Sequence, residues 1–344
     1  MSSPETITAS AGGARRRATM LRLGMVATAV ALAAGCSAAP STEVPSQPAA
    51  AAPGFPMTID NCGVQVRLDA PPQRVVTIYQ HPAEIMYALG LERSMVGTAY
   101  PDNPYLPQFA AANASVPQIS DKDASFEQVL ATGPDMVYGG YDSAFSADKG
   151  TARERYQQSG VATYQNSEAC TPKVTMDTVW SEIRTVARMF GVPERGESLV
   201  SDLQRRVDAS SARVAGAPPV SVFVYDSGED TAFTAGGRGI SNDVIARAGG
   251  RNVFGDLDDL FGDVSFEQVA QRAPDVIVIY DYADGSGGVE AKKRFLLARP
   301  ELASVPAIRN QRFTTLTLQD GVVGVRPPMA VETLARALHP DRFR

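Results

Sequence analysis

Histidine is scarce in this sequence of 344 residues. His81 and His339 are its only histidines, so we expect no metal site built from several imidazoles. Motifs of catalysis are missing as well: there is no Gly-x-Ser-x-Gly elbow, His-Glu-x-x-His zinc site, Cys-x-x-Cys pair or phosphate loop. The glycines at 236–239 lack the spacing of a phosphate cradle. The sequence therefore predicts no catalytic residues and no enzyme.

An excess of positive charge is also absent. The formal net charge is −6. The first 35 residues carry four arginines and one glutamate, so the rest of the chain has a formal charge of −9. Because nucleic-acid binding needs cationic surfaces that neutralise phosphates, no nucleic-acid partner is expected.

An apolar run of 12 residues, Leu23–Ala34, follows a stretch that contains four arginines. It is too short to span a bilayer and is typical of an export signal. The run ends at Ala33-Ala34-Gly35-Cys36, which resembles a bacterial lipobox. We expect a lipoprotein signal peptide over residues 1–35 and a secreted protein anchored through Cys36 to the outer face of the cytoplasmic membrane. The alternative is an ordinary signal peptide with an incidental cysteine.

Residues 36–56 are rich in alanine, proline and serine, a composition that suits a disordered tether. The other two cysteines, Cys62 and Cys170, would then lie in a compartment where disulfides persist. They either pair or remain as two buried thiols, and the sequence favours neither alternative.

A motif that begins Ser-Phe-Glu-Gln-Val occurs twice, at Ser125–Tyr138 and at Ser265–Val278, so the second copy begins 140 residues after the first. In each copy a serine at the N-cap precedes a short helix, Pro-Asp makes a turn, and an apolar β-branched strand follows. Strands and helices alternate around both copies, which predicts parallel sheets covered by helices. The simplest explanation is two similar α/β domains.

Two helices are expected between these domains, at Met176–Phe190 and at 194–214, because apolar residues recur there at helical spacing. The second helix would be roughly 30 Å long, enough to cross from one domain to the other. We expect an N-terminal lobe at 57–192, an interlobe helix at 193–215 and a C-terminal lobe at 216–344. A connecting helix also predicts limited closure on ligand binding.

Three pieces of sequence together carry a family resemblance. They are Pro72–Ile78 with the Ala-Leu-Gly-Leu and Met-Val-Gly that follow, Phe233–Gly236 with Ile240–Phe254, and the duplicated motif. Across nearly all of residues 57 to 338, the chain resembles the periplasmic-binding-protein family for iron-siderophores, haem and vitamin B12. The resemblance implies an α/β fold of two Rossmann-like lobes, each a mostly parallel sheet flanked by helices, joined by one long helix. It also implies a lipid-anchored solute-binding protein of an ABC importer.

The resemblance has consequences for partners. Family members dock on their permease through the glutamate of each duplicated element, which implies Glu127 and Glu267 here. The alternative is that these carboxylates only complement a helix dipole. The expected ligand is a ferric siderophore or similar bulky metal chelate, with cobalamin or haem as alternatives, so iron enters only as part of the chelate and no resident cofactor is expected.

The expected partner is an ABC permease in the cytoplasmic membrane, and the protein is expected to be a monomer. An envelope sensor without a permease would share the fold.

Ligand contacts are expected at the carboxyl ends of the strands, where the loops of the two lobes face each other. Tyrosines concentrate there and suit a bulky ligand of mixed polarity, or they cap the sheets. A histidine among them would contact the ligand or complete the coordination of its iron. These loops hold few arginines beside many acids, which favours a neutral or cationic ligand such as a ferric hydroxamate. The predicted ligand-binding residues are Tyr79, His81, Tyr138, Tyr141, Tyr225, Arg238, Tyr280, Tyr282 and Arg326.

Overall fold

A computed structural model describes residues 52–282 and 288–344. The predicted signal peptide, the predicted lipidation site Cys36 and most of the predicted tether lie outside the described residues. Contacts divide the chain into residues 1–49 and 50–344, and the described residues all belong to the second unit. Within them, no helix combines the length and the apolar character needed to cross a membrane.

The N-terminal lobe contains a five-stranded parallel sheet in the order β5-β4-β3-β6-β7. The central strand β3 is buried along its whole length, as a strand covered on both faces must be. A separate antiparallel hairpin, β1–β2, precedes the sheet. The elements are β1 (Met57–Asn61), β2 (Val64–Leu68), β3 (Val75–Ile78), α1 (Gln80–Ala88), β4 (Met95–Ala99), α2 (Ala110–Ala114), β5 (Gln118–Ser120), α3 (Phe126–Ala131), β6 (Met136–Gly139), α4 (Arg153–Gln158) and β7 (Ala162–Gln165).

The C-terminal lobe contains a four-stranded parallel sheet in the order β10-β8-β12-β13. A two-stranded antiparallel ribbon, β9–β11, accompanies this sheet. The elements are β8 (Val220–Tyr225), β9 (Ala232–Ala235), α7 (Ile240–Arg247), β10 (Gly250–Asn252), β11 (Phe261–Val264), α8 (Phe266–Arg272), β12 (Val276–Asp281), α9 (Gly288–Leu297), α10 (Pro306–Arg309), β13 (Phe313–Thr317) and α11 (Pro327–Leu338).

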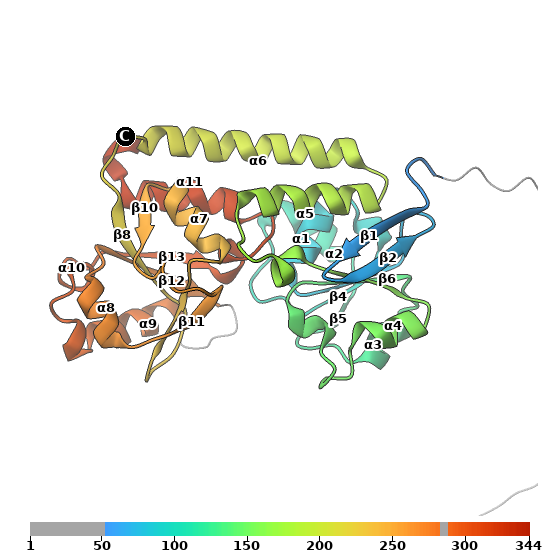
Figure 1. The fold of residues 1–344 in the computed structure, drawn as a ribbon, viewed down its shortest axis with the longest axis horizontal. Coiled ribbons are helices and arrows are strands. Elements are labelled where there is room, and N and C mark those ends of the chain that lie inside the picture. Colours follow the sequence, from blue (N-terminus) through green and yellow to red (C-terminus); the bar gives the residue numbers. More distant parts are fainter. Residues whose placement is uncertain (1–51, 283–287) are drawn as a thin grey trace, which may run out of the picture. The chain divides into compact units, whose positions relative to one another are not determined.

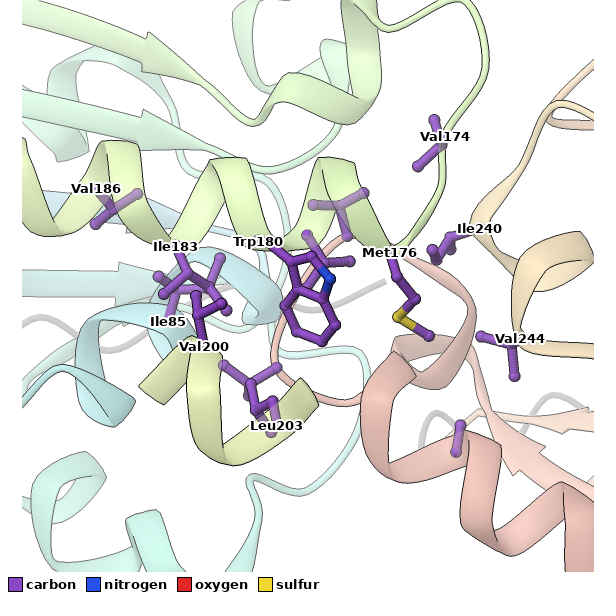
Figure 2. Close-up of a cluster of buried hydrophobic side chains, with 14 of the residues drawn as sticks. Ile85, Val174, Met176, Trp180, Ile183, Val186, Val200, Leu203, Ile240 and Val244 are labelled. Carbon is purple, nitrogen blue, oxygen red and sulfur yellow. The ribbon is translucent and has the colours of Figure 1, made fainter. Parts of the chain in front are cut away.

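Two consecutive helices, α5 (Met176–Met189) and α6 (Pro193–Val214), lead from one lobe to the other. Helix α6 lies along α5 in the N-terminal lobe and along α11 in the C-terminal lobe (Figure 1). The buried side chains around Trp180 come from both lobes, with Ile85 of α1 on one side and Val244 of α7 on the other (Figure 2). The two-lobed α/β fold with its long helix is confirmed. A shared core of this kind restrains movement of one lobe against the other.

The duplicated motif forms the same structure in both lobes. In α3, the Ser125 hydroxyl accepts the backbone N–H of Gln128 while the Gln128 side chain accepts the Ser125 N–H, and Ser265 and Gln268 repeat this capping box in α8. Figure 1 shows both helices on the side of their lobes away from α6. Local capping chemistry therefore places Glu127 and Glu267 at equivalent positions in the two lobes.

Cys62 and Cys170 form a disulfide, with their Cα atoms 5.3 Å apart. Cys62 lies in the turn between β1 and β2, and Cys170 ends the short 3₁₀ helix at Ser167–Cys170, directly after β7. The disulfide therefore attaches the hairpin to a segment whose Asn166 and Glu168 hydrogen-bond Val323 of the other lobe.

Candidate functional site

An aromatic cluster gathers where the strands of the N-terminal lobe end and face the C-terminal lobe. It consists of Tyr79, His81, Tyr100 and Tyr141. The ring of Tyr79 is 5.1 Å from that of Tyr100 and 4.7 Å from that of Tyr141, and Tyr141 lies 4.8 Å from the His81 ring. All three contacts are edge-on, the geometry that aromatic quadrupoles favour. The structure thus brings three of the predicted ligand-binding residues together.

Tyr79 joins β3 to α1 in a strained backbone conformation, with φ 75° and ψ 164°. That region is essentially reserved for glycine, and residues held there cluster at functional sites. Its N–H donates to the Ala99 carbonyl of β4 at 2.9 Å, and its hydroxyl hydrogen-bonds Ser143 at 2.8 Å. Burial raises the pKa of Tyr79 to about 12, so its hydroxyl is protonated at neutral pH.

His81 lies in the first turn of α1 and not in the loop where the sequence placed it. Its ring packs on Gly140, where a Cβ atom would come within 2.4 Å of Nε2, and Gly324 of the C-terminal lobe lies against its Cβ. A Cβ at Gly140 would clash with the ring, and one at Gly324 would be crowded by the His81 Cβ at 3.2 Å. The side chain is 2% exposed. Burial lowers the pKa of His81 to about 4, so the imidazole is neutral at pH 7.

The N-terminal lobe makes two hydrogen bonds to the backbone of Val323, in the segment that precedes α11. The Asn166 side chain donates to the Val323 carbonyl at 3.1 Å, and the Val323 N–H donates to the Glu168 carboxylate at 2.7 Å. Asn166 and Glu168 both follow β7 and are buried. Burial raises the pKa of Glu168 to about 7. Sequence reasoning missed this contact, and the only available signal was that polar residues directly follow a strand.

Arg326 holds the same segment through an ion pair with Glu84 of α1, with Arg326 Nη2 2.5 Å and Nε 2.8 Å from the carboxylate oxygens. The two side chains are 6% and 1% exposed. Arg326 also donates to the Pro104 carbonyl. Arg238 likewise donates to a carbonyl, that of Pro172. The structure therefore uses both predicted ligand-binding arginines to join the lobes and not to line an open site.

Three predicted ligand-binding tyrosines lie inside the lobes. Tyr138 is fully buried and its hydroxyl donates to Glu182 at 2.5 Å. The Tyr225 hydroxyl donates to the Gly228 carbonyl at 2.7 Å, and that of Tyr280 hydrogen-bonds Ser241 at 2.6 Å. For these three, the alternative that strand-terminal tyrosines complete the packing of the sheets describes the structure better.

Tyr282 does reach the junction between the lobes. Its hydroxyl donates to Asp226 at 2.6 Å, and Lys292 stacks over its ring while donating to the carbonyls of Asp226 and Tyr280. A cavity of about 100 Å³ lies beside it, lined by Tyr282 from one lobe and by residues 100–102, 121 and 122 from the other. Ligand pockets for drug-sized molecules are about 300–1,000 Å³. A bulky ligand therefore requires the lobes to separate from the arrangement described here.

Several buried polar atoms at the junction have no hydrogen-bond partner in the described part of the chain. They are both ring nitrogens of His81, the hydroxyl of Tyr141, Oδ1 of Asn103 and Oε1 of Gln319. Gln319 approaches both His81 and Tyr141 without completing a hydrogen bond. Buried polar groups are normally satisfied, so a cluster of unsatisfied ones indicates a place where a ligand or ordered water belongs. Sequence reasoning missed Asn103 and Gln319, although each follows a strand.

The two glutamates of the duplicated motif are exposed. Glu127 pairs with Arg155 at 2.9 Å, and Arg155 also stacks over Phe126. The pKa of Glu127 is lowered by its own backbone N–H and by Arg155. In the C-terminal lobe the equivalent stacking arginine, Arg299 over Phe266, pairs with Glu301. Within the described ranges Glu267 makes no ion pair. Nor do these ranges contain a group of three or more histidine, cysteine or acidic side chains placed to hold a metal ion.

Comparisons with known proteins agree with this architecture. A family model described as periplasmic binding protein matches residues 75–319. The cobalamin-binding protein of Halobacterium salinarum is 27% identical over 91% of this chain and 82% of its own length. The ABC transporter substrate-binding lipoprotein YvrC of Bacillus subtilis is 23% identical over 84% of this chain and 88% of its own.

Among solved structures, one from Saccharomonospora viridis, described as an ABC-type Fe³⁺-hydroxamate transport system, is 28% identical with a TM-score of 0.71. The match covers 84% of this chain and 99% of that one. The family model, the full-length relatives and the two-lobed fold lead to one conclusion: the chain belongs to the periplasmic binding protein family and is a substrate-binding protein of the ABC-transporter type, not an enzyme.

Proposed function

We propose that the chain captures a bulky metal chelate between its lobes and hands it to an ABC permease. The chelate is a ferric siderophore, with a corrinoid or haem as the alternative cargo. The observation that carries this proposal is the group of buried, unsatisfied polar atoms on His81, Asn103, Tyr141 and Gln319, which lie where the lobes meet.

The junction suits reversible capture because it combines aromatic and polar groups. Tyr79, Tyr100, Tyr141 and Tyr282 offer broad apolar rings, each with a hydroxyl, to a ligand whose surface is part apolar and part polar. His81 adds a neutral imidazole that can contact the ligand or an open position on its metal. Names of relatives support this class of cargo, since one binds cobalamin and another structure belongs to an Fe³⁺-hydroxamate system.

Delivery uses Glu127 and Glu267 in this proposal. They occupy equivalent exposed positions in the two lobes, where two carboxylates can meet cationic side chains of a two-fold permease through charge-assisted hydrogen bonds. Acylation of Cys36 would hold the protein as a monomer at the outer face of the cytoplasmic membrane, next to that permease. A relative that is named a lipoprotein supports this placement.

Calorimetric titration of the full chain tests the proposal. The panel is a ferric hydroxamate, a ferric catecholate, ferric citrate, haem and cobalamin. Saturable binding of one class at micromolar affinity or tighter is the expected result. If no member binds to protein shown to be folded by circular dichroism, the capture of metal chelates is ruled out for this chain. Calorimetry is preferred to tryptophan fluorescence because the single tryptophan, Trp180, is packed in the core shown in Figure 2.

A further inference from the structure

The unsatisfied atoms at the junction are mostly hydrogen-bond acceptors. Asn103 uses its amide N–H₂ to donate to the Asp281 carbonyl at 3.1 Å, and Gln319 uses its own to donate to Asp102 at 2.8 Å. What remains is Oδ1 of Asn103 and Oε1 of Gln319, each able only to accept. The side chains are 4% and 1% exposed, so water does not reach them freely.

The other two unsatisfied groups are neutral. Tyr141 has a hydroxyl, which both donates and accepts, and a neutral His81 has one donor and one acceptor nitrogen. His81 is neutral at pH 7 because burial lowers its pKa to about 4. These four side chains together can therefore bind a ligand that carries hydrogen-bond donors. None of the four carries a positive charge.

Opening the lobes does not remove this excess of acceptors. Separation breaks the two interlobe bonds and frees the amide donors of Asn103 and Gln319. The same step removes one donor from the Asp281 carbonyl and one from the Asp102 carboxylate, so the balance of donors and acceptors at the junction does not change. One of these acceptors, Asp102, is a carboxylate and adds negative charge.

The basic side chains at the junction are engaged elsewhere. Arg326 pairs with Glu84, Arg238 donates to the Pro172 carbonyl, and Lys292 donates to two backbone carbonyls. Lys122 lies at the rim, stacked over Tyr100 at 5.2 Å. A carboxylate brought into this site would face acceptor oxygens, while the buried cations Arg326 and Lys292 already hold acceptors of their own. Burial of such a charge is strongly unfavourable.

We propose that the junction selects metal chelates whose surface carries amide N–H groups and no net negative charge, and that it rejects chelates that present carboxylates. A carboxamide supplies an N–H to Asn103 Oδ1 or Gln319 Oε1 and a carbonyl to Tyr141. This inference rests on the proposed capture function and narrows its ligand class. It goes beyond charge alone because it assigns the selection to Asn103 and Gln319.

Two matched ligand pairs test the inference by calorimetry on the full chain at pH 7.5. One pair is dicyanocobinamide and dicyanocobyrinic acid, which carry carboxamides and carboxylates on the same corrin ring. The other is ferrioxamine B and its N-succinyl derivative, in which a carboxylate replaces the amine. In whichever pair binds, we expect the ligand without the carboxylate to bind about 100-fold more tightly than the ligand with it. This factor is the cost of leaving one buried charge unpaired.

The outcomes separate this inference from the function on which it rests. If a carboxylate member binds as tightly as its partner, or if only haem or ferric citrate binds, the amide selection is wrong and chelate capture stands. If none of the chelates binds, the capture function itself fails and the inference with it.

Variants locate the selection. Gln319→Leu and Asn103→Leu should each weaken binding of the amide member about five- to tenfold, the effect of losing one neutral hydrogen bond. The control is Gln108→Leu, at an exposed glutamine in the segment before α2, which should leave affinity unchanged. Thermal melting shows whether each variant folds. Unchanged affinity in two folded junction variants would overturn the assignment.

Discussion

Single residues at the junction carry opposing effects of pH on stability. The pKa of His81 is lowered to about 4 by burial, and that of Glu168 is raised to about 7 for the same reason. The His81 contribution to stability is complete above pH 6.5 and is lost as the pH falls toward 4. The Glu168 contribution is complete below pH 4.5 and is lost as the pH rises through 7. The two partly cancel between these limits.

Replacing His81 should make the effect of Glu168 visible. In His81→Leu, the free energy of unfolding should rise more steeply than in the unmodified protein as the pH is lowered from 7 to 4.5, because the opposing effect of His81 is gone. The difference between the two proteins should shift by about 2 kcal/mol over this range, since one pH unit of unmatched protonation is worth about 1.4 kcal/mol. Urea unfolding at a series of pH values measures it. Parallel pH profiles for both proteins would show that His81 is not buried as a neutral ring.

The buried ion pair of Glu84 and Arg326 should contribute strongly to stability. Arg326→Met should lower the free energy of unfolding by about 3–5 kcal/mol, because it leaves a buried carboxylate without its partner. Adding Glu84→Leu should restore much of the loss. As a control, Arg67→Ala breaks the exposed pair with Asp69, whose side chains are 65% and 77% exposed, and should cost at most about 1 kcal/mol. Equal small losses in Arg67→Ala and Arg326→Met would contradict the structure.

Secondary-structure elements differ in how well the sequence predicted them. The capping boxes of α3 and α8 and the helix α6 follow from local patterns, so Ser125, Ser265 and the stretch 194–214 were sufficient evidence. Which strand-terminal tyrosines point into the junction depends on sheet twist and on contacts with the other lobe. Tyr141, just after β6, approaches Gln319 of the C-terminal lobe, whereas Tyr138, within β6, donates to Glu182 of its own lobe.

The disulfide connects two elements, the β1–β2 hairpin and the segment that hydrogen-bonds Val323. It closes a loop of 108 residues, so removing it enlarges the conformational freedom of the unfolded chain. Cys62→Ser together with Cys170→Ser should lower the free energy of unfolding by about 2–4 kcal/mol, measured with urea. The unmodified protein treated with a reductant should match the variant. A loss below about 0.5 kcal/mol would show that the pairing contributes little.

The glutamates of helices α3 and α8 should be needed for transfer of the chelate to the permease. In cells that hold the permease, Glu267→Ala should reduce chelate uptake at least about tenfold while calorimetric binding is unchanged. Glu127→Ala should reduce uptake less, because Arg155 already pairs with Glu127. Glu290→Ala, at an exposed position in α9, is the control. Full uptake with both motif glutamates removed would favour a sensor that serves no permease.

At the scale of the whole unit, the sequence predicted two lobes and a ligand site between them but not the closed junction. Glu84 and Arg326 are 242 residues apart along the chain, and no local pattern links them. The same holds for Gln319 and Asp102, which are 217 residues apart. These contacts arise only when both lobes are complete, which is why the residues that join the lobes were missed or were assigned to the ligand.

A hollow larger than the cavity beside Tyr282 lies away from the junction. It measures about 810 Å³ and lies on the N-terminal lobe, lined by residues 65–73, 135, 157 and 160–163. It has neither the aromatic cluster nor the unsatisfied polar atoms, so size alone would place the ligand there. The proposed function places it between the lobes, on the chemistry of the side chains there.

Hydrogen exchange of the full chain, with and without the chelate that binds most tightly, decides between these two locations. The account predicts slower exchange on binding in the segments that meet at the junction, residues 79–81, 100–105, 140–141 and 318–324, and no change at residues 65–73 or 157–163. Protection confined to the latter segments would contradict the central claim that the ligand binds between the lobes.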